Sequence, residues 1–183
     1  MKKLFVPFLI LLLLTSFGCS KKVTVVKVSP DRDSQAQYSS PSQDNIDGSE
    51  NHLRQAKRFY IDGKYNQARK QCEKAIALNH RNWEAHYYLG LAMQKKNEYT
   101  ISIEALGVGL KYAPDNRYVK SEIHFAIGYS WERMGKPTKA MEEYDQALAF
   151  NPGNDTARKA KSRVKVNKTM KNWDKSREID YDG

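Results

Sequence analysis

The chain has 183 residues and a formal net charge of +10, from 31 lysines and arginines against 21 aspartates and glutamates. This length predicts one folded domain with extensions rather than two large domains. Two cysteines, Cys19 and Cys72, are too few for the disulfide framework of a small exported protein. No cysteine–histidine cluster has the spacing of a zinc site.

The N-terminus has the three parts of an export signal. Two lysines precede an apolar run over residues 4–17, and the small residue Gly18 comes directly before Cys19. The run is shorter than the about 20 residues that a helix needs to cross a bilayer. We therefore expect residues 1–18 to be a signal peptide that is removed.

A signal that ends in a small residue and a cysteine resembles that of bacterial lipoproteins. The resemblance implies that Cys19 is acylated and becomes the first residue, and that Ser20 after it directs the protein to the outer membrane. Several acyl chains hold a protein firmly, whereas one binds only marginally. Ser16 and Phe17 depart from the lipoprotein pattern, which has leucine and then a small residue there. The alternative is an ordinary signal cut nearby, with Cys19 an unmodified thiol.

Residues 19–48 are expected to form a flexible tether after the lipidated cysteine. The later part of this segment is rich in serine, glutamine, aspartate and proline. Such a composition buries too little apolar surface to offset the entropy of ordering. Residues 23–28 are β-prone, and the alternative is that they add an edge strand, although the sequence shows no partner strand.

After the tether, the same pattern of residues occurs three times. The copies begin at Gly63, Asn97 and Gly135, and in each a similar series of small and apolar residues follows. The second copy begins 34 residues after the first, and the third begins 38 residues after the second. A period of this length is typical of a solenoid of helix pairs. The four extra residues, 117–120, are not turn-formers, and they predict one extra helical turn at the start of the third unit.

Small residues recur where two helices must come close. In the first helix of each unit they are Ala56, Gly90 and Gly128, and a larger apolar residue follows three positions later. Small side chains at crossings let the ridges of one helix enter the grooves of another. The second helices carry matching small residues at Ala68, Ser102 and Ala140, and others at Ala75, Gly109 and Ala147 that are expected to let the next unit approach.

These residues resemble those of tetratricopeptide repeat (TPR) proteins. The predicted fold is all-α: an α-solenoid of three TPR helix pairs with a C-terminal capping helix. The three units are placed at residues 49–82, 83–116 and 121–154. Proline ends the second and third units, as expected for a residue that stops a helix.

The segment after the third unit is predicted to be a basic capping helix over residues 155–176, followed by a frayed tail over 177–183. TPR arrays usually need a final helix that covers the last apolar surface, and Ala157, Ala160 and Val164 are spaced for one helix face. The rest of 157–171 carries seven lysines and arginines and no acid. The candidate basic patch consists of Arg158, Lys161, Arg163, Lys165 and Lys168.

The TPR resemblance implies a concave groove lined by the first helix of each unit. Its predicted partner-binding residues are Lys57, Tyr60, Tyr87, Leu91, Gln94, Lys95, Phe125, Tyr129 and Arg133. The remaining groove positions hold Leu53, Ile61, Glu84, Glu122 and Glu132. Tyrosine and arginine are favoured at interfaces, whereas Leu53, Ile61, Leu91 and Phe125 are equally compatible with the core. The lysine/asparagine clamp for chaperone C-termini is not matched, because Leu53 and Lys57 stand at its first two positions.

The sequence shows no catalytic constellation. His52, His86 and His124 share one repeat position, but equivalent positions on successive units are usually too far apart for one metal ion, so we expect packing roles. Cys72 stands at a core position and is expected to be a buried apolar residue. There is no glycine-rich phosphate loop. We therefore expect no enzyme activity, no cofactor and no metal.

These observations lead to one function and one alternative. The expected function is a non-enzymatic protein–protein interaction scaffold of the bacterial cell envelope, lipid-anchored at the outer membrane and facing the periplasm. The resemblance implies a protein partner in the groove and a role in assembling an outer-membrane, pilus or secretion complex. The alternative is a basic adaptor that binds anionic lipid or cell-wall polymer through residues 157–171. A nucleic-acid partner is not expected, because an exported protein rarely meets one.

Overall fold

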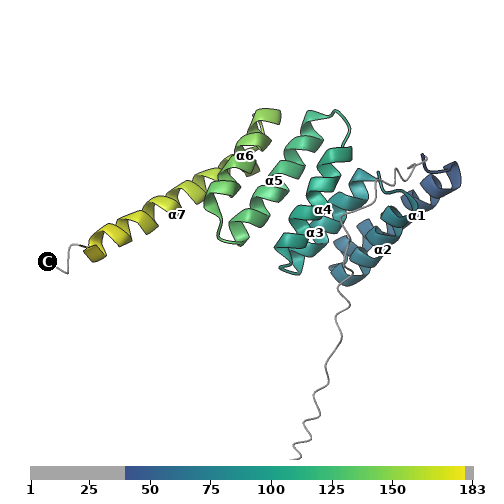
Figure 1. Cartoon of the computed structure of the whole chain (residues 1–183), viewed down its shortest axis with the longest axis horizontal. Helices are drawn as coiled ribbons and strands as arrows, with labels where there is room; N and C mark the ends of the chain where they lie inside the picture. Colours follow the sequence, from purple (N-terminus) through teal and green to yellow (C-terminus); the bar gives the residue numbers. More distant parts are fainter. Residues whose placement is uncertain (1–39, 180–183) are drawn as a thin grey trace, which may run out of the picture. The chain divides into compact units, whose positions relative to one another are not determined.

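The computed structural model describes residues 40–179, with side chains placed up to residue 167. The predicted signal peptide, Cys19 and most of the predicted tether lie outside the described residues. Within the described part the chain forms seven helices and no strand (Figure 1). The helices are α1 (Gln43–Ile61), α2 (Tyr65–Leu78), α3 (Trp83–Lys95), α4 (Tyr99–Tyr112), α5 (Arg117–Arg133), α6 (Pro137–Phe150) and α7 (Asp155–Ile179).

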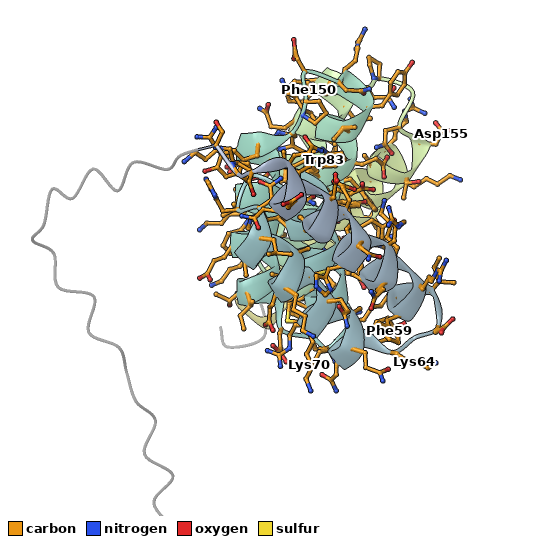
Figure 2. All side chains as sticks on the ribbon, turned by 90° about the vertical axis from the view of Figure 1, so that its right-hand side faces the viewer. Phe59, Lys64, Lys70, Trp83, Phe150 and Asp155 are labelled. Carbon is orange, nitrogen blue, oxygen red and sulfur yellow. The ribbon has the colours of Figure 1, made fainter. Side chains whose placement is uncertain are left out.

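The helices pack as three successive pairs and a final helix. The pairs are α1 with α2, α3 with α4, and α5 with α6, and α7 packs on α6. The first helices also contact one another, α1 with α3, α3 with α5 and α5 with α7, whereas α2, α4 and α6 make no such contacts among the seven described helices. The predicted all-α solenoid of helix pairs is confirmed, and its first helices share one side. Long polar side chains such as Lys64 and Lys70 lie on the outside of the stack (Figure 2).

The turn inside each pair has the same backbone geometry. Gly63, Asn97 and Gly135 have φ values of 73°, 61° and 69°. Glycine adopts this left-handed region freely, and asparagine tolerates it better than most residues. The next residue in each unit donates its N–H back to the first helix, as Lys64 does to the Phe59 carbonyl at 2.8 Å. The recurrent glycine or asparagine therefore marks where each first helix ends.

The boundary between tether and repeats was predicted too late in the chain. Residues 43–48, which the sequence assigned to the tether, form the first turns of α1. The Ser42 side chain caps this helix by accepting a hydrogen bond from the Asn45 N–H, and Asp44 lies in the first turn, where a negative charge favours the helix dipole. Gly48 faces Leu78 of α2. A polar segment is therefore helical because it has a cap and a partner helix.

Two glycines allow the helices of a pair to come close. A Cβ atom on Gly90 would lie 2.5 Å from Leu106 Cγ, and one on Gly128 would lie 2.7 Å from the Tyr144 ring. These contacts confirm the predicted crossings. Gly109 differs from its prediction, because its nearest neighbours are backbone atoms of Trp83 and Tyr87 in α3 of the same unit. It serves packing within the second unit rather than the approach of the next one.

A buried polar clamp joins the first unit to the second. Asn82 caps α3 by accepting a hydrogen bond from the Ala85 N–H at 3.1 Å. Its side-chain amide donates to Ser49 Oγ at 2.9 Å, and Ser49 Oγ donates to the Ala75 carbonyl at 2.9 Å. Buried polar groups are stable only when they are bonded in this way. The same bonds recur between the third unit and α7, among Ala157, Asn154, Ser121 and Ala147.

The junction between the second and third units is built differently. Trp83 stands at the repeat position that Ser49 and Ser121 occupy in the other two units. Helix α5 has 17 residues against 13 in α3 and begins at Arg117, with Asn116 as its cap. The predicted extra turn at 117–120 is confirmed. This junction therefore lacks the serine of the buried clamp, and the helix that follows it, α5, is extended at its start by the four extra residues.

Helix α7 covers the end of the array. Ala157, Ala160 and Val164 are buried, and the last two pack in one cluster with Ala140 and Tyr144 of α6. These are the residues that the sequence placed on one face. The helix continues to Ile179, so residues 177–179, predicted to belong to the frayed tail, are helical.

Candidate functional site: a groove between α1, α3 and α5

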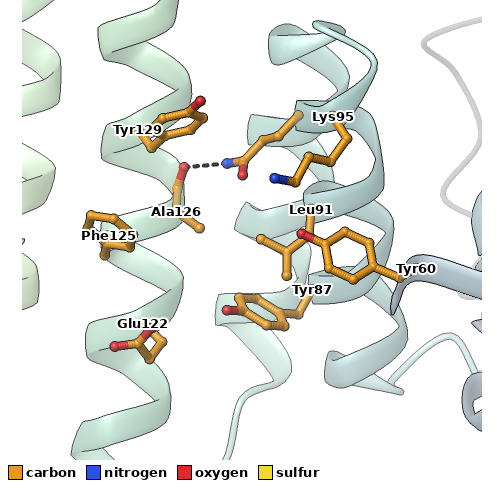
Figure 3. A pocket seen from close by; sticks show the side chains of 9 residues that line it. Tyr60, Tyr87, Leu91, Lys95, Glu122, Phe125, Ala126 and Tyr129 are labelled. Carbon is orange, nitrogen blue, oxygen red and sulfur yellow. Dashed lines mark hydrogen bonds between the residues drawn. The ribbon is translucent and has the colours of Figure 1, made fainter. Parts of the chain in front are cut away.

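The side shared by the first helices contains a pocket of about 290 Å³, which we call the groove pocket (Figure 3). Helix α1 contributes one residue, and α3 and α5 form its two long walls. The lining residues are Tyr60, Tyr87, Leu91, Gln94, Lys95, Glu122, Phe125, Ala126 and Tyr129. Seven of the nine predicted groove residues are therefore brought together in one cavity.

Four tyrosine rings form a row beside the groove pocket, and two of them, Tyr60 and Tyr87, line it. The Tyr60 ring meets the edges of Tyr65 and Tyr88, with centroids 5.7 and 5.8 Å apart, and Tyr88 in turn meets Tyr87 at 5.7 Å. Such edge-to-face pairs are favourable beyond the area they bury. Since the row spans α1, α2 and α3, it holds in place Tyr60 and Tyr87, the two of its tyrosines that line the pocket.

The hydroxyl groups of Tyr60 and Tyr87 are protonated at neutral pH, because the pKa of each is raised. Burial raises the pKa of Tyr60, and the neighbouring Tyr65 and Tyr88 raise it further. Burial also raises the pKa of Tyr87, with a further contribution from Glu122. Protonated phenols both donate and accept hydrogen bonds. The wall can therefore pack against apolar groups and also bond to the backbone of a bound chain.

Two polar side chains at one end of the pocket have different roles. The Gln94 amide donates to the Ala126 carbonyl at 2.7 Å and to Ser130 Oγ at 2.9 Å, so it ties α3 to α5 (Figure 3). Lys95 is exposed and extends into the pocket, and it makes no ion pair or hydrogen bond with any residue in the described part of the chain. The amide is structural, whereas the lysine is available to a ligand.

Two predicted groove residues do not line the pocket. Lys57 forms an ion pair with Glu84 at 2.6 Å. Arg133 donates to the Tyr99 hydroxyl at 3.2 Å and lies over the Tyr99 ring. Ala126 lines the pocket although the sequence did not indicate it, because a small residue in the middle of a helix reads as a packing position.

The four apolar positions with an open interpretation fall into three environments. Leu53 is 1% exposed and belongs to the core, whereas Ile61 is 81% exposed. Leu91 and Phe125 pack against core clusters with one side and line the pocket with the other. Leu91 and Phe125 therefore belong both to the core packing and to the lining of the pocket, and their binding role stays a prediction.

A second pocket adjoins the first at the junction of the second and third units. This junction pocket has a volume of about 230 Å³, and its lining residues are Trp83, Tyr87, Tyr118, Val119, Glu122 and Ile123. It shares Tyr87 and Glu122 with the groove pocket. The sequence did not indicate it, although the four extra residues that supply Tyr118 and Val119 were visible.

The histidines and the cysteine lie apart from both pockets. His52 bonds to Gln71 and His124 to Glu143, at 2.7 and 2.8 Å, and His86 donates to the His80 carbonyl. Cys72 is fully buried, and burial raises the pKa of its thiol to about 12. No group of three or more histidine, cysteine, aspartate or glutamate side chains in residues 40–167 is arranged to hold a metal ion.

One predicted basic residue is part of a network that holds the capping helix. Arg163 donates two hydrogen bonds of 2.8 Å to the carboxylate of Glu132 on α5. The same carboxylate accepts a bond of 2.6 Å from the hydroxyl of Tyr144, whose side chain is fully buried on α6. Paired charge-assisted bonds of this kind are strong and directional. The network therefore joins α5, α6 and α7.

The other residues of the predicted basic patch are mostly engaged within the chain or outside the described part. Ion pairs join Arg158 to Asp155 and Lys161 to Asp145. Lys165 is exposed, and the side chain of Lys168 is not among the described ones. Much of the positive charge on the first turns of α7 is therefore balanced by acids of the protein itself.

Acid is expected to weaken the network around Glu132. Burial alone raises the pKa of this carboxyl, but the bonds from Arg163 and Tyr144 outweigh it, so the pKa lies below its ordinary value. A lowered pKa stabilises the folded protein above the ordinary value near 4.5, and this contribution is lost as the pH falls through the folded pKa. The difference in free energy of unfolding between wild type and Glu132→Gln should be full at pH 7 and shrink below pH ~4.5. A constant difference from pH 7 to pH 3.5 in urea titrations would contradict this assignment.

Comparison with known families explains the recurring geometry. Residues 56–97 match a model described as TPR repeat, and residues 121–154 match a model of the tetratricopeptide repeat. These two segments are tetratricopeptide repeats. The TPR helix pairs account for the close crossings at Gly90 and Gly128 and for the side that carries both pockets. No curated protein matches the chain in sequence.

Solved structures with the same fold include TPR domains from several organisms. The Arabidopsis OM64 TPR domain has a TM-score of 0.63 at 20% identity, covering 67% of this chain and 98% of that one. The Yersinia enterocolitica chaperone SycD, solved with a peptide of the translocator YopD, has a TM-score of 0.62 at 18% identity, covering 69% and 99%. The second TPR domain of human RPAP3, solved with an HSP70 peptide, has a TM-score of 0.58 at 21% identity, covering 66% and 95%. At these identities the likeness shows the fold alone.

The described TPR helices contain no stretch that is both long enough and apolar enough to cross a bilayer.

Proposed function

We propose that this protein is a non-enzymatic protein–protein interaction scaffold that binds a segment of a partner protein in the groove pocket. The observation that carries the proposal is the lining of that pocket. Aromatic side chains from α1, α3 and α5 converge on one cavity, and Lys95 extends into it without a partner in the described part of the chain. Rigid aromatic side chains supply contact area at a low cost in conformational entropy.

Similar proteins support this use of the fold. SycD and the second TPR domain of RPAP3 were both solved in complex with peptides. A peptide that binds in an extended form needs bonds to its backbone and pockets for its side chains. The tyrosine hydroxyls and the apolar faces of Leu91 and Phe125 offer both in the groove pocket.

Loss of two tyrosines is expected to abolish partner capture. Tyr87→Ala combined with Tyr129→Ala removes two of the four aromatic side chains that line the pocket, and aromatic anchors commonly dominate the binding energy of an interface. The tagged full chain, purified from membranes, should lose the partners that wild type retains in mass spectrometry, with unchanged helical circular dichroism.

Because Tyr87 also packs against the core, Lys95→Glu serves as a second variant that changes an exposed residue. Ile101→Ala is the matched control, since it removes an apolar side chain that is 47% exposed on α4 and lines neither pocket. Partners that persist in both groove variants would rule out binding in the groove pocket.

We further propose that the scaffold is attached to the cell envelope through Cys19, at the outer membrane and facing the periplasm. The support is the sequence alone: a charged start, a short apolar run, and a small residue before the cysteine. A tether after the cysteine would let the repeats reach a partner away from the membrane surface. The scaffold then serves the assembly of an outer-membrane, pilus or secretion complex.

Labelled palmitate is expected to be incorporated into wild type and not into Cys19→Ser. The thiol is the acceptor of the lipid, so its replacement by a hydroxyl should leave the chain unlabelled and uncut at this position. Cys72→Ser is the matched control, because Cys72 is buried and its thiol pKa is raised to about 12 by burial, so it should not accept lipid. Equal labelling of wild type and Cys19→Ser would exclude the anchor.

A further inference from the structure

The junction pocket has properties that neither the repeat pattern nor the groove positions account for. We propose that it is an anchor site for one large apolar side chain of the bound segment, and that an aspartate or glutamate of the same segment meets Lys95. This inference rests on the proposed function, because it names the chemistry of the segment that the groove would bind.

Two local departures from the repeat create the junction pocket. The four extra residues lengthen α5 at its start, and they bring Tyr118 and Val119 to the end of the groove. In addition, Trp83 replaces the serine that forms the buried clamp at the other two junctions. Together, the two changes place an apolar cavity where the other two junctions have the buried polar clamp.

The lining of the junction pocket suits an apolar group. Ile123 is fully buried, and Trp83, Tyr87 and Val119 pack against the core cluster that contains it. Four of the six lining residues of the junction pocket are therefore held in place. Tyr118, by contrast, is 66% exposed. Ligand sites are typically concave and mostly apolar. An apolar side chain of a ligand that enters this pocket would cover part of the Tyr118 ring that is otherwise exposed to solvent.

The two pockets adjoin each other. Both are lined by Tyr87 and Glu122, so a bound segment has to pass only these two residues to occupy both pockets. Figure 3 shows Glu122 at one end of the groove pocket and Lys95 at the other. The apolar anchor and the lysine therefore engage different positions of one bound segment.

Charge complementarity selects an acidic residue for the second position. Glu122 already accepts a bond from the Asn154 amide at 3.1 Å, and Lys57 nearby is paired with Glu84. Among the charged residues that line either pocket, Lys95 has no ion pair or hydrogen bond within the described part of the chain. Residues 51–154 as a whole carry 16 lysines and arginines against 11 acids. The lysine without an acidic partner and the positive surplus of the repeats favour an acidic residue at the position that meets Lys95, whereas Glu122 lies at the other end of the groove pocket.

Selection from a display library of random 12-residue peptides tests the inference. The full chain should enrich peptides in which a large apolar residue stands at a fixed separation from an aspartate or glutamate. Tyr118→Ala should abolish the preference at the apolar position and weaken the enriched peptide at least tenfold, as expected for losing a buried aromatic contact. Lys95→Glu should replace the acidic preference with a basic one.

The controls separate this inference from the proposed function. Ile101→Ala also removes an exposed apolar side chain, and it should select the same peptides as wild type. Peptides that require Tyr129 but are selected unchanged by Tyr118→Ala and Lys95→Glu would overturn the inference and leave groove binding intact. If only Tyr118→Ala changed the selected peptides, the acidic contact with Lys95 would be excluded. If only Lys95→Glu changed them, the apolar anchor in the junction pocket would be excluded. If no peptide is enriched by wild type, groove binding and the anchor site are both excluded.

Discussion

Replacing Tyr144 by alanine is expected to lower the free energy of unfolding by about 3–5 kcal/mol, the usual cost of truncating a buried aromatic residue. Tyr144 is fully buried and packs in one cluster with Ala140, Ala160 and Val164. Its removal leaves a cavity between α5, α6 and α7. It also takes away the hydroxyl that donates to Glu132, so one variant disrupts both the packing and the polar network.

Urea denaturation followed by circular dichroism measures this change. Tyr144→Phe keeps the ring and removes only the hydroxyl, so it should cost about 1.5–3 kcal/mol, the range for a lost hydrogen bond to a charged group. Tyr118→Ala, which removes a mostly exposed tyrosine, should change the free energy of unfolding by no more than about 0.5 kcal/mol. A Tyr144→Ala variant within about 1 kcal/mol of wild type would mean that α7 does not depend on this contact.

Valine at Gly90 is expected to destabilise the protein by several kcal/mol, because the first atom of the new side chain has no space. Its Cβ would lie 2.5 Å from Leu106 Cγ and 3.2 Å from the Ser102 carbonyl oxygen. Leu106 is itself fully buried and cannot move aside. Overpacking of this kind typically costs about 1–3 kcal/mol, and the two further methyl groups of valine would add to it.

A second glycine provides the matched control. Gly107 also lies inside a helix, but an added Cβ there meets nothing within 4 Å. Gly107→Ala should therefore stabilise the protein by about 0.5–1 kcal/mol, since alanine forms helices better than glycine. Thermal unfolding of both variants gives the comparison. If Gly90→Val and Gly107→Ala shifted the melting temperature in the same direction, the close approach of the helices would not be the reason why position 90 holds glycine.

The sequence predicted the features that repeat, because each is set by a spacing rule. A helix crossing needs a small residue at one position, so Gly90 and Gly128 revealed the pairs. The turn inside each pair needs a residue that adopts the left-handed region, which explains why glycine or asparagine recurs at Gly63, Asn97 and Gly135 in the repeating pattern. Groove positions followed from the same register, and seven of the nine predicted residues line the groove pocket.

The sequence did not predict features that depend on contacts between distant residues. Ser42 looked like part of a polar tether, because the partner of α1 is a helix that follows it in the chain. Arg163 looked like a free surface charge, because Glu132 lies on a different helix. The junction pocket arises from a replacement at Trp83 and an insertion at 117–120, and only the fold brings these together.

The insertion before the third unit has a consequence for how the array responds to a ligand. In a solenoid, stability is close to a sum of unit terms and nearest-neighbour coupling terms. A segment bound across α3 and α5 would add chiefly to the coupling between the second and third units, because the first unit contributes only Tyr60 to the groove pocket. A bound segment would therefore strengthen the interface between the second and third units, and these two units would unfold together as one cooperative block.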